Sequence, residues 1–155
     1  MQQKYIEYIP SVLLVFQHIE EAIRQYLLRC EVMTAARLHG ITKYRISNKG
    51  IGKLSLGRLV DNFEKVNGND SLIEELRSII VERNYFAHQS YIALFGKGES
   101  SKDIQEIESL YERAVKAKES AEKCFLNLLK EIEILENNFT EIQKKSTEHF
   151  TPADG

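Results

Sequence analysis

The stretch DIQEIESLYERAVKAKESAEKCFLNLLKEIEILENNFTEIQKK, residues 103–145, decides the fold of this chain. Its apolar side chains recur every seven residues, at Ile107, Ala114, Ala121, Leu128, Leu135 and Ile142. This spacing places them on one face of a long α-helix, with charged residues around the rest of its surface. A helix of about 40 residues spans roughly 60 Å, more than a domain of this size needs. Two alternatives follow: the helix breaks once, near Asn137–Asn138, or it extends to pack on another subunit.

Upstream of this stretch, a first helix is predicted from about Pro10 to His39, and residues 1–9 add an earlier helical piece. Apolar residues fall there at alternating steps of three and four, which is the spacing of one helix face. Pro10 suits a first-turn position, and Gly40 suits the residue just past the end. Residues 41–54 show no clean periodicity and are predicted to form a loop.

Two more helices are predicted in the middle of the chain. A short one should follow Ser55, a good N-cap residue, and end at the turn-forming Asn67–Asp70 segment. The next should begin at Asp70 or Ser71, since Ser71 and Glu74 have capping-box spacing, and run to about Phe95. Its last part is apolar nearly all round, which is typical of a helix buried on several sides. We therefore expect it to be the central helix.

Together these patterns predict an all-α fold, an antiparallel bundle of four to five helices with a long C-terminal helix. We expect one domain over residues 1–146 and a disordered tail over residues 147–155. The longest aliphatic and aromatic run is five residues, too short for a membrane span or a signal-peptide core. We therefore expect a cytoplasmic protein without a membrane partner. Two cysteines, Cys30 and Cys124, lie in helical patterns and are predicted to be buried thiols.

One segment is strongly basic although the whole chain has a net charge of −2. No acidic residue occurs between Glu31 and Asp61, and local positive charge of this kind suits the binding of an anion. We therefore regard four of its cations as candidate RNA-binding residues: Lys43, Arg45, Lys49 and Lys53. The alternative is a solvated connector whose charges balance the acidic helices.

The sharpest chemical feature is the hexamer Arg-Asn-Tyr-Phe-Ala-His at residues 83–88. An arginine and a histidine in apolar surroundings are costly unless something pairs or uses them. At about 100° per residue, Arg83 and His88 lie roughly 140° apart around the helix. The hexamer resembles the signature of the HEPN superfamily: an arginine, a polar residue after it, and a histidine four to six residues further on. Arg83, Asn84 and His88 match those three positions.

The resemblance implies a metal-independent endoribonuclease of the toxin–antitoxin or phage-defence type, with no cofactor and no metal site. His88 would act as general acid or base on the 2′-hydroxyl, Arg83 would hold the scissile phosphate, and Asn84 would position one of them. Family members dimerise with the motif helices facing each other. The implied partners are therefore RNA, a second copy of the chain and an antitoxin protein.

The alternative to the ribonuclease hypothesis is that the chain has no catalytic activity. The chain would then be a HEPN-like module for dimerisation or for binding nucleotide or RNA. Arg83 would form an ion pair with Glu82 of a partner or with a carboxylate of the long helix, and His88 would be a core histidine with its polar atoms satisfied. A third reading is an adaptor whose long C-terminal helix recruits another protein.

Overall fold

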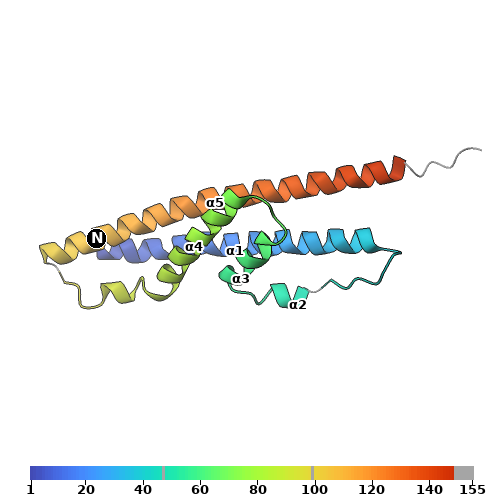
Figure 1. Ribbon diagram of the computed structural model, residues 1–155. Coiled ribbons are helices and arrows are strands. Elements are labelled where there is room, and N and C mark those ends of the chain that lie inside the picture. Colours follow the sequence, from blue (N-terminus) through green and yellow to red (C-terminus); the bar gives the residue numbers. More distant parts are fainter. Residues whose placement is uncertain (47, 99, 149–155) are drawn as a thin grey trace, which may run out of the picture.

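Figure 1 shows a bundle built on two long helices, α1 (Gln2–Leu38) and α5 (Ser101–Glu148). This computed structural model describes residues 1–46, 48–98 and 100–148, without the side chains of residues 48, 49 and 145–148. Within these residues every regular element is helical. The predicted all-α bundle with a long C-terminal helix is therefore confirmed, and that helix continues without a break through Asn137–Asn138.

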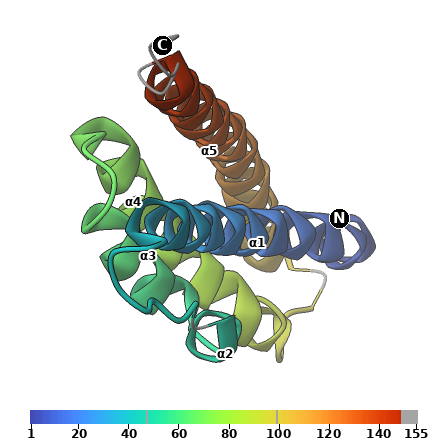
Figure 2. The same ribbon diagram turned by 90° about the vertical axis from the view of Figure 1, so that its right-hand side faces the viewer.

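Between the long pair, the described residues form three shorter helices and one 3₁₀ turn. They are α2 (Asn48–Ile51), α3 (Leu56–Glu64), α4 (Asp70–His88) and η1 (Ile92–Leu94). Seen from the end at which α1 finishes, α2, α3 and α4 gather on one side of the α1–α5 pair (Figure 2). The segment predicted as a loop over residues 41–54 thus contains one helical turn, α2.

The two long helices run in the same direction. Near the start of each, the rings of Tyr8 and Tyr111 pack edge to face with centroids 5.3 Å apart. Further along both helices, Arg29 Nε lies 2.5 Å from Glu136 Oε1. Early residues of α1 therefore contact early residues of α5, and later residues of α1 contact later residues of α5.

Helix α4 runs against both long helices. The start of α4 contacts the later part of α5, where Asn69 donates a hydrogen bond to Glu131. The end of α4 contacts the earlier part of α5, where Glu82 pairs with Arg113. The predicted antiparallel arrangement is thus found where α4 packs against α1 and where α4 packs against α5. In such an up–down–up order the first and last helices must be parallel.

Pro10 does not start α1, as the sequence had suggested, but lies inside it. A proline within a helix removes one backbone hydrogen bond, a cost of about 3 kcal/mol. The buried side chains on either side, Tyr5, Ile9 and Val12, are completely shielded from solvent and hold the helix on one continuous path. Packing of the apolar stripe therefore outweighs the local preference of proline.

Helix α4 begins at Asp70, as predicted, but its cap and its end differ from the prediction. Its N-cap is Asn69, whose side-chain oxygen accepts a hydrogen bond from the backbone of Leu72, and not the Ser71 of the predicted capping box. The helix ends at His88 instead of Phe95, and a turn leads into η1. Ser90 stabilises the end of the helix at this point, because its buried hydroxyl donates a hydrogen bond to the Phe86 carbonyl at 2.7 Å.

The core lies where α1, α3, α4 and α5 meet. Its largest fully buried side chains come from all four helices and include Tyr5, Phe16, Phe63, Phe86 and Leu128.

Of the two cysteines, Cys124 is buried as predicted, whereas Cys30 is partly exposed. None of the described helices combines the length and apolar character needed to cross a membrane. Of the predicted disordered tail, residues 147 and 148 belong to α5, and residues 149–155 lie outside the described part of the chain.

Candidate functional site

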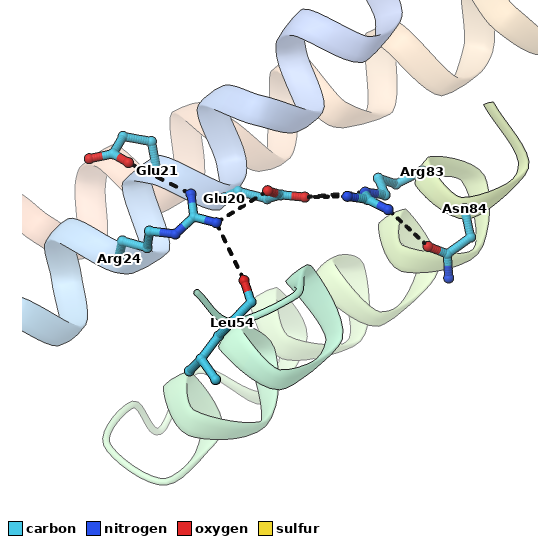
Figure 3. Close-up of polar contacts among 6 residues, drawn as sticks. All are labelled: Glu20, Glu21, Arg24, Leu54, Arg83 and Asn84. Atoms are coloured by element: carbon cyan, nitrogen blue, oxygen red, sulfur yellow. Dashed lines mark hydrogen bonds and ion pairs between the residues drawn. The ribbon is translucent and has the colours of Figure 1, made fainter. Parts of the chain in front are cut away.

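Arg83 extends from α4 to the middle of α1, where it meets Glu20 (Figure 3). Its Nε donates to Glu20 Oε1 at 3.2 Å, and a terminal nitrogen lies 3.1 Å from the same oxygen. The Arg83 side chain is 30% exposed and that of Glu20 only 13%. The pair is therefore partly shielded from water, which strengthens its attraction beyond that of a surface ion pair.

Glu20 also binds a second arginine, Arg24, one turn further along α1. A terminal nitrogen of Arg24 lies 3.4 Å from the other carboxylate oxygen of Glu20 and donates to the Leu54 carbonyl. One carboxylate thus holds two guanidinium groups, as Figure 3 shows. The Arg24 Nε is buried and has no hydrogen-bond acceptor among the described residues. Arg24 also lies 3.7 Å from the exposed carboxylate of Glu21, so two carboxylates balance the two guanidinium groups of the cluster.

Arg83 is also linked to its neighbour in the motif. Its other terminal nitrogen donates to Asn84 Oδ1 at 3.4 Å. A guanidinium has five N–H donors, and the contacts with Glu20 and Asn84 engage at most three of them. At least two donors of Arg83 therefore remain for another acceptor.

His88, the third motif residue, is exposed at the last position of α4. No hydrogen bond or ion pair joins it to any residue in the described part of the chain. The expectation that it is a core histidine is therefore wrong. The reason is helical geometry: His88 follows Asn84 and Val81 on the outward face, while Phe86 takes the inward position.

Apolar side chains before and after His88 in the sequence are exposed. We use the term motif face for the exposed residues Val81, Asn84, His88, Tyr91, Ile92 and Phe95. Its exposed fractions are 64% for Val81, 67% for Ile92 and 92% for Phe95. The prediction that residues 85–95 are buried on several sides is thus wrong for a single chain. Only Phe86, Ser90 and Leu94 of this segment are buried, because the turn after His88 takes the chain off the helical path.

Glu82 has a partner within its own chain. Its two carboxylate oxygens accept from Nε and a terminal nitrogen of Arg113 at 2.9 and 3.0 Å. The Arg113 guanidinium also stacks on the ring of Tyr85, 3.6 Å from its centroid. The hydrogen bond from Glu82 raises the pKa of Arg113. The expected partner of Arg83 was Glu82 of a partner chain or a carboxylate of the long C-terminal helix. Instead, Arg83 pairs with Glu20 of α1, and Glu82 pairs with Arg113.

The four basic candidates lie apart from the motif in sequence. Lys43, Arg45 and Lys53 are exposed, whereas the side chain of Lys49 lies outside the description. In the described residues the segment is joined to the motif through a chain of contacts, from the Leu54 carbonyl to Arg24, Glu20 and Arg83. The structure thus connects the end of the basic segment to the motif, but not its lysines to His88.

Sequence reasoning missed Glu20 and Arg24. Their spacing of four residues is typical of an ion pair along one helix and predicts nothing about a third residue. Only the packing of α4 on α1, fixed by the Phe16–Phe86 ring contact, places Arg83 beside Glu20.

Comparison with known proteins gives no match: no family model, no curated protein and no solved structure is similar to this chain. The fold and the site define the class of protein as an all-α helical bundle. The resemblance to the HEPN superfamily continues to depend on Arg83, Asn84 and His88.

Proposed function

We propose that the chain is a metal-independent endoribonuclease that uses Arg83, Asn84 and His88. The observation that supports this best is the state of Arg83. It is anchored by Glu20 and hydrogen-bonded to Asn84, yet keeps at least two N–H donors for a phosphate. An arginine fixed in this way is preorganised, so less conformational freedom is lost when it binds an anion.

The chemistry follows from the two side chains. A histidine has an ordinary pKa of about 6.5, so it can exchange protons near neutral pH. His88 would remove the proton of a ribose 2′-hydroxyl, whose oxygen attacks the adjacent phosphorus and displaces the 5′-oxygen of the next nucleotide, which takes a proton from water as it leaves. Arg83 would hold the phosphate and stabilise the charge that develops on it. The products are a 2′,3′-cyclic phosphate and a 5′-hydroxyl.

A second copy of the chain has a place in this proposal. Arg83 points to α1 and His88 points outward, roughly 140° away around α4. The exposed apolar residues of the motif face suit contact with another protein surface. A dimer formed there would bring Asn84 and His88 of each copy towards those of the other.

The test is cleavage of single-stranded RNA by purified full-length chain. His88→Ala should reduce the rate about 100-fold or more, the usual contribution of a general acid or base. His39→Ala is the matched control, since His39 is also exposed and lies at the end of α1, and it should keep full activity. Equal rates for the two variants, or no cleavage by the parent chain, would refute the proposal.

The basic segment gives a separate measurement of RNA binding. Reversing Lys43 and Arg45 to glutamate should weaken RNA affinity and flatten its dependence on salt concentration, because fewer counterions are then released. Reversing Arg58, a cation outside the four candidates that is also exposed, is the control and should have a smaller effect. An unchanged salt dependence in the double variant would assign the segment to the role of connector.

The second candidate function is a non-catalytic binding or dimerisation module. It is favoured by the same ion pair, because Arg83 already has Glu20 as a counter-charge and needs no substrate to satisfy it. This function predicts no RNA cleavage and a large loss of stability in Arg83→Ala. The ribonuclease predicts cleavage that Arg83→Lys, which keeps the charge but loses the planar fork, reduces without unfolding the chain.

A further inference from the structure

A pocket of about 490 Å³ lies between the later part of α1, the turn α2 and the end of α3. It forms because the chain turns back after α1 and runs through α2 to α3 (Figure 1). Pockets of roughly 300–1,000 Å³ are usual for the binding of small organic molecules. None of the described residues that line this pocket belongs to α4, so it is separate from the motif face.

Part of the pocket wall is apolar. Leu27 of α1 is buried there, and Ile51 and Leu54 are half-buried and pack against the core. Cys30 also lines the pocket, and burial raises the pKa of its thiol. An apolar group of a ligand would therefore be removed from water when it lies against these side chains, which favours binding.

Glu31 supplies a carboxylate to the same pocket. Its side chain is half-buried, and one carboxylate oxygen accepts a hydrogen bond from the Tyr44 hydroxyl at 2.8 Å. Glu31 forms no ion pair in the described part of the chain, although the segment that follows it is basic. A carboxylate has about four positions at which it accepts hydrogen bonds, so most of those of Glu31 remain for a ligand. A half-buried carboxylate without a counter-charge favours a bound cation.

The cation that lines the pocket is in a different state. Lys65 is exposed, and its ammonium group donates a hydrogen bond to Asn62 Oδ1 at 3.3 Å. An exposed ammonium group is strongly hydrated and gains little from pairing with an anion. The half-buried carboxylate of Glu31 gains more from a partner than Lys65 does. The charge of the ligand is therefore set by Glu31.

We propose that this pocket binds a small organic amine. The apolar part of the amine lies against Leu27, Ile51 and Leu54, and its ammonium group pairs with the Glu31 carboxylate. The Tyr44 hydroxyl holds that carboxylate in position, and the Tyr44 ring offers the ammonium group a second, cation–π contact. The site uses neither Arg83 nor His88, so this inference goes beyond RNA cleavage and does not depend on it.

The experiment uses the thiol of Cys30, which lines the pocket, to report whether the pocket is occupied. The full-length chain is treated with iodoacetamide at about pH 8.5, where part of the thiol is reactive thiolate, and alkylation of each cysteine is followed by mass spectrometry. The probe is phenylbutylamine at about 10 mM, which exceeds the low-millimolar Kd expected for a molecule of this size. The amine should slow the alkylation of Cys30 about threefold or more, because most pockets are then occupied. Cys124 is the internal control, since it is buried and reacts quickly only if the chain unfolds.

Two analogues test the charge of the ligand. Phenylbutanol has the same apolar part without a charge, and phenylbutyrate has the opposite charge. Both should protect Cys30 less than the amine does. Equal protection by the alcohol, stronger protection by the carboxylate, or no protection by any of the three compounds overturns the proposal.

Two variants test the role of Glu31. Glu31→Gln should remove most of the protection of Cys30 by the amine, while slow alkylation of Cys124 shows that the variant is folded. Glu7→Gln is the matched control, because Glu7 is an exposed glutamate of α1 outside the pocket, and it should keep full protection. Full protection in Glu31→Gln overturns the proposal. The readout is thiol alkylation and not RNA cleavage, so failure of the ribonuclease proposal leaves this outcome unaffected.

Discussion

Nε of Arg83 lies 3.2 Å from Oε1 of Glu20, a residue 63 positions earlier in the chain. This contact ties the last turns of α4 to the middle of α1. It also sets the direction in which Arg83 presents its remaining donors. Glu20 is thus a positioning residue for the candidate site as well as a structural link.

Replacing Glu20 by glutamine should show both roles. The neutral amide keeps nearly the same shape but no longer balances Arg24 and Arg83, so the free energy of unfolding should fall by about 1–2 kcal/mol. Urea denaturation of Glu20→Gln measures this change. Glu21→Gln is the control, because Glu21 is 58% exposed and lies 3.7 Å from Arg24, and it should cost less than about 0.5 kcal/mol. Equal losses in the two variants would contradict the assignment.

Asn69 joins two functions at the start of α4. Its side-chain oxygen caps the helix, and its amide nitrogen donates to Glu131 of α5 at 2.6 Å. Asn69→Asp keeps a good cap but sets two carboxylates against each other, so it should destabilise the chain by about 1 kcal/mol or more. The same substitution with Glu131→Gln should recover most of the loss. A thermal melt of the single and double variants checks this, and no recovery would mean that the cap geometry itself was damaged.

The buried thiol of Cys124 should make the stability of the chain depend on pH in the alkaline range. Burial raises the pKa of its thiol to about 12 from an ordinary value near 9. Above that ordinary value the unfolded chain loses the thiol proton while the folded chain keeps it, so stability falls as the pH rises from about 9 towards 12. Between about pH 8 and pH 10, the stability advantage of the parent chain over Cys124→Ala should shrink by about 1 kcal/mol. A constant difference would show that the thiol ionises equally in both states.

The sequence predicts the helices of this chain well, because an apolar stripe of helical period is enough to define them. The seven-residue repeat from Ile107 to Ile142 defines α5, and Gly40, with its positive φ of 80°, follows the end of α1 as expected. Pro10 and the end of α4 were placed wrongly, because long-range packing decided both. Tyr5 illustrates this: it is fully buried five residues before Pro10, and its hydroxyl donates to the carbonyl of Ser90 at 3.4 Å.

The candidate site was only partly predictable for the same reason. Arg83, Asn84 and His88 are visible as a local motif, and their angular separation follows from helix geometry. Whether each faces the core or solvent depends on which side of α4 packs against α1. Periodicity could not settle this, because Arg83 falls on an apolar stripe and His88 on another. The structure places the arginine inward against a carboxylate and leaves the histidine outside.

The parallel pairing of α1 with α5 also constrains how the chain folds. Of the helices described, α1 is made before the others and has its main partner in α5, which is made after them; the contact between Arg29 and Glu136 spans 107 positions. Contacts so distant in sequence form late and slow the search for the native state. Until α5 is complete, the apolar stripe of α1 stays open to water and to other chains, which exposes the growing polypeptide to aggregation. The last third of the sequence therefore determines when the first third is protected.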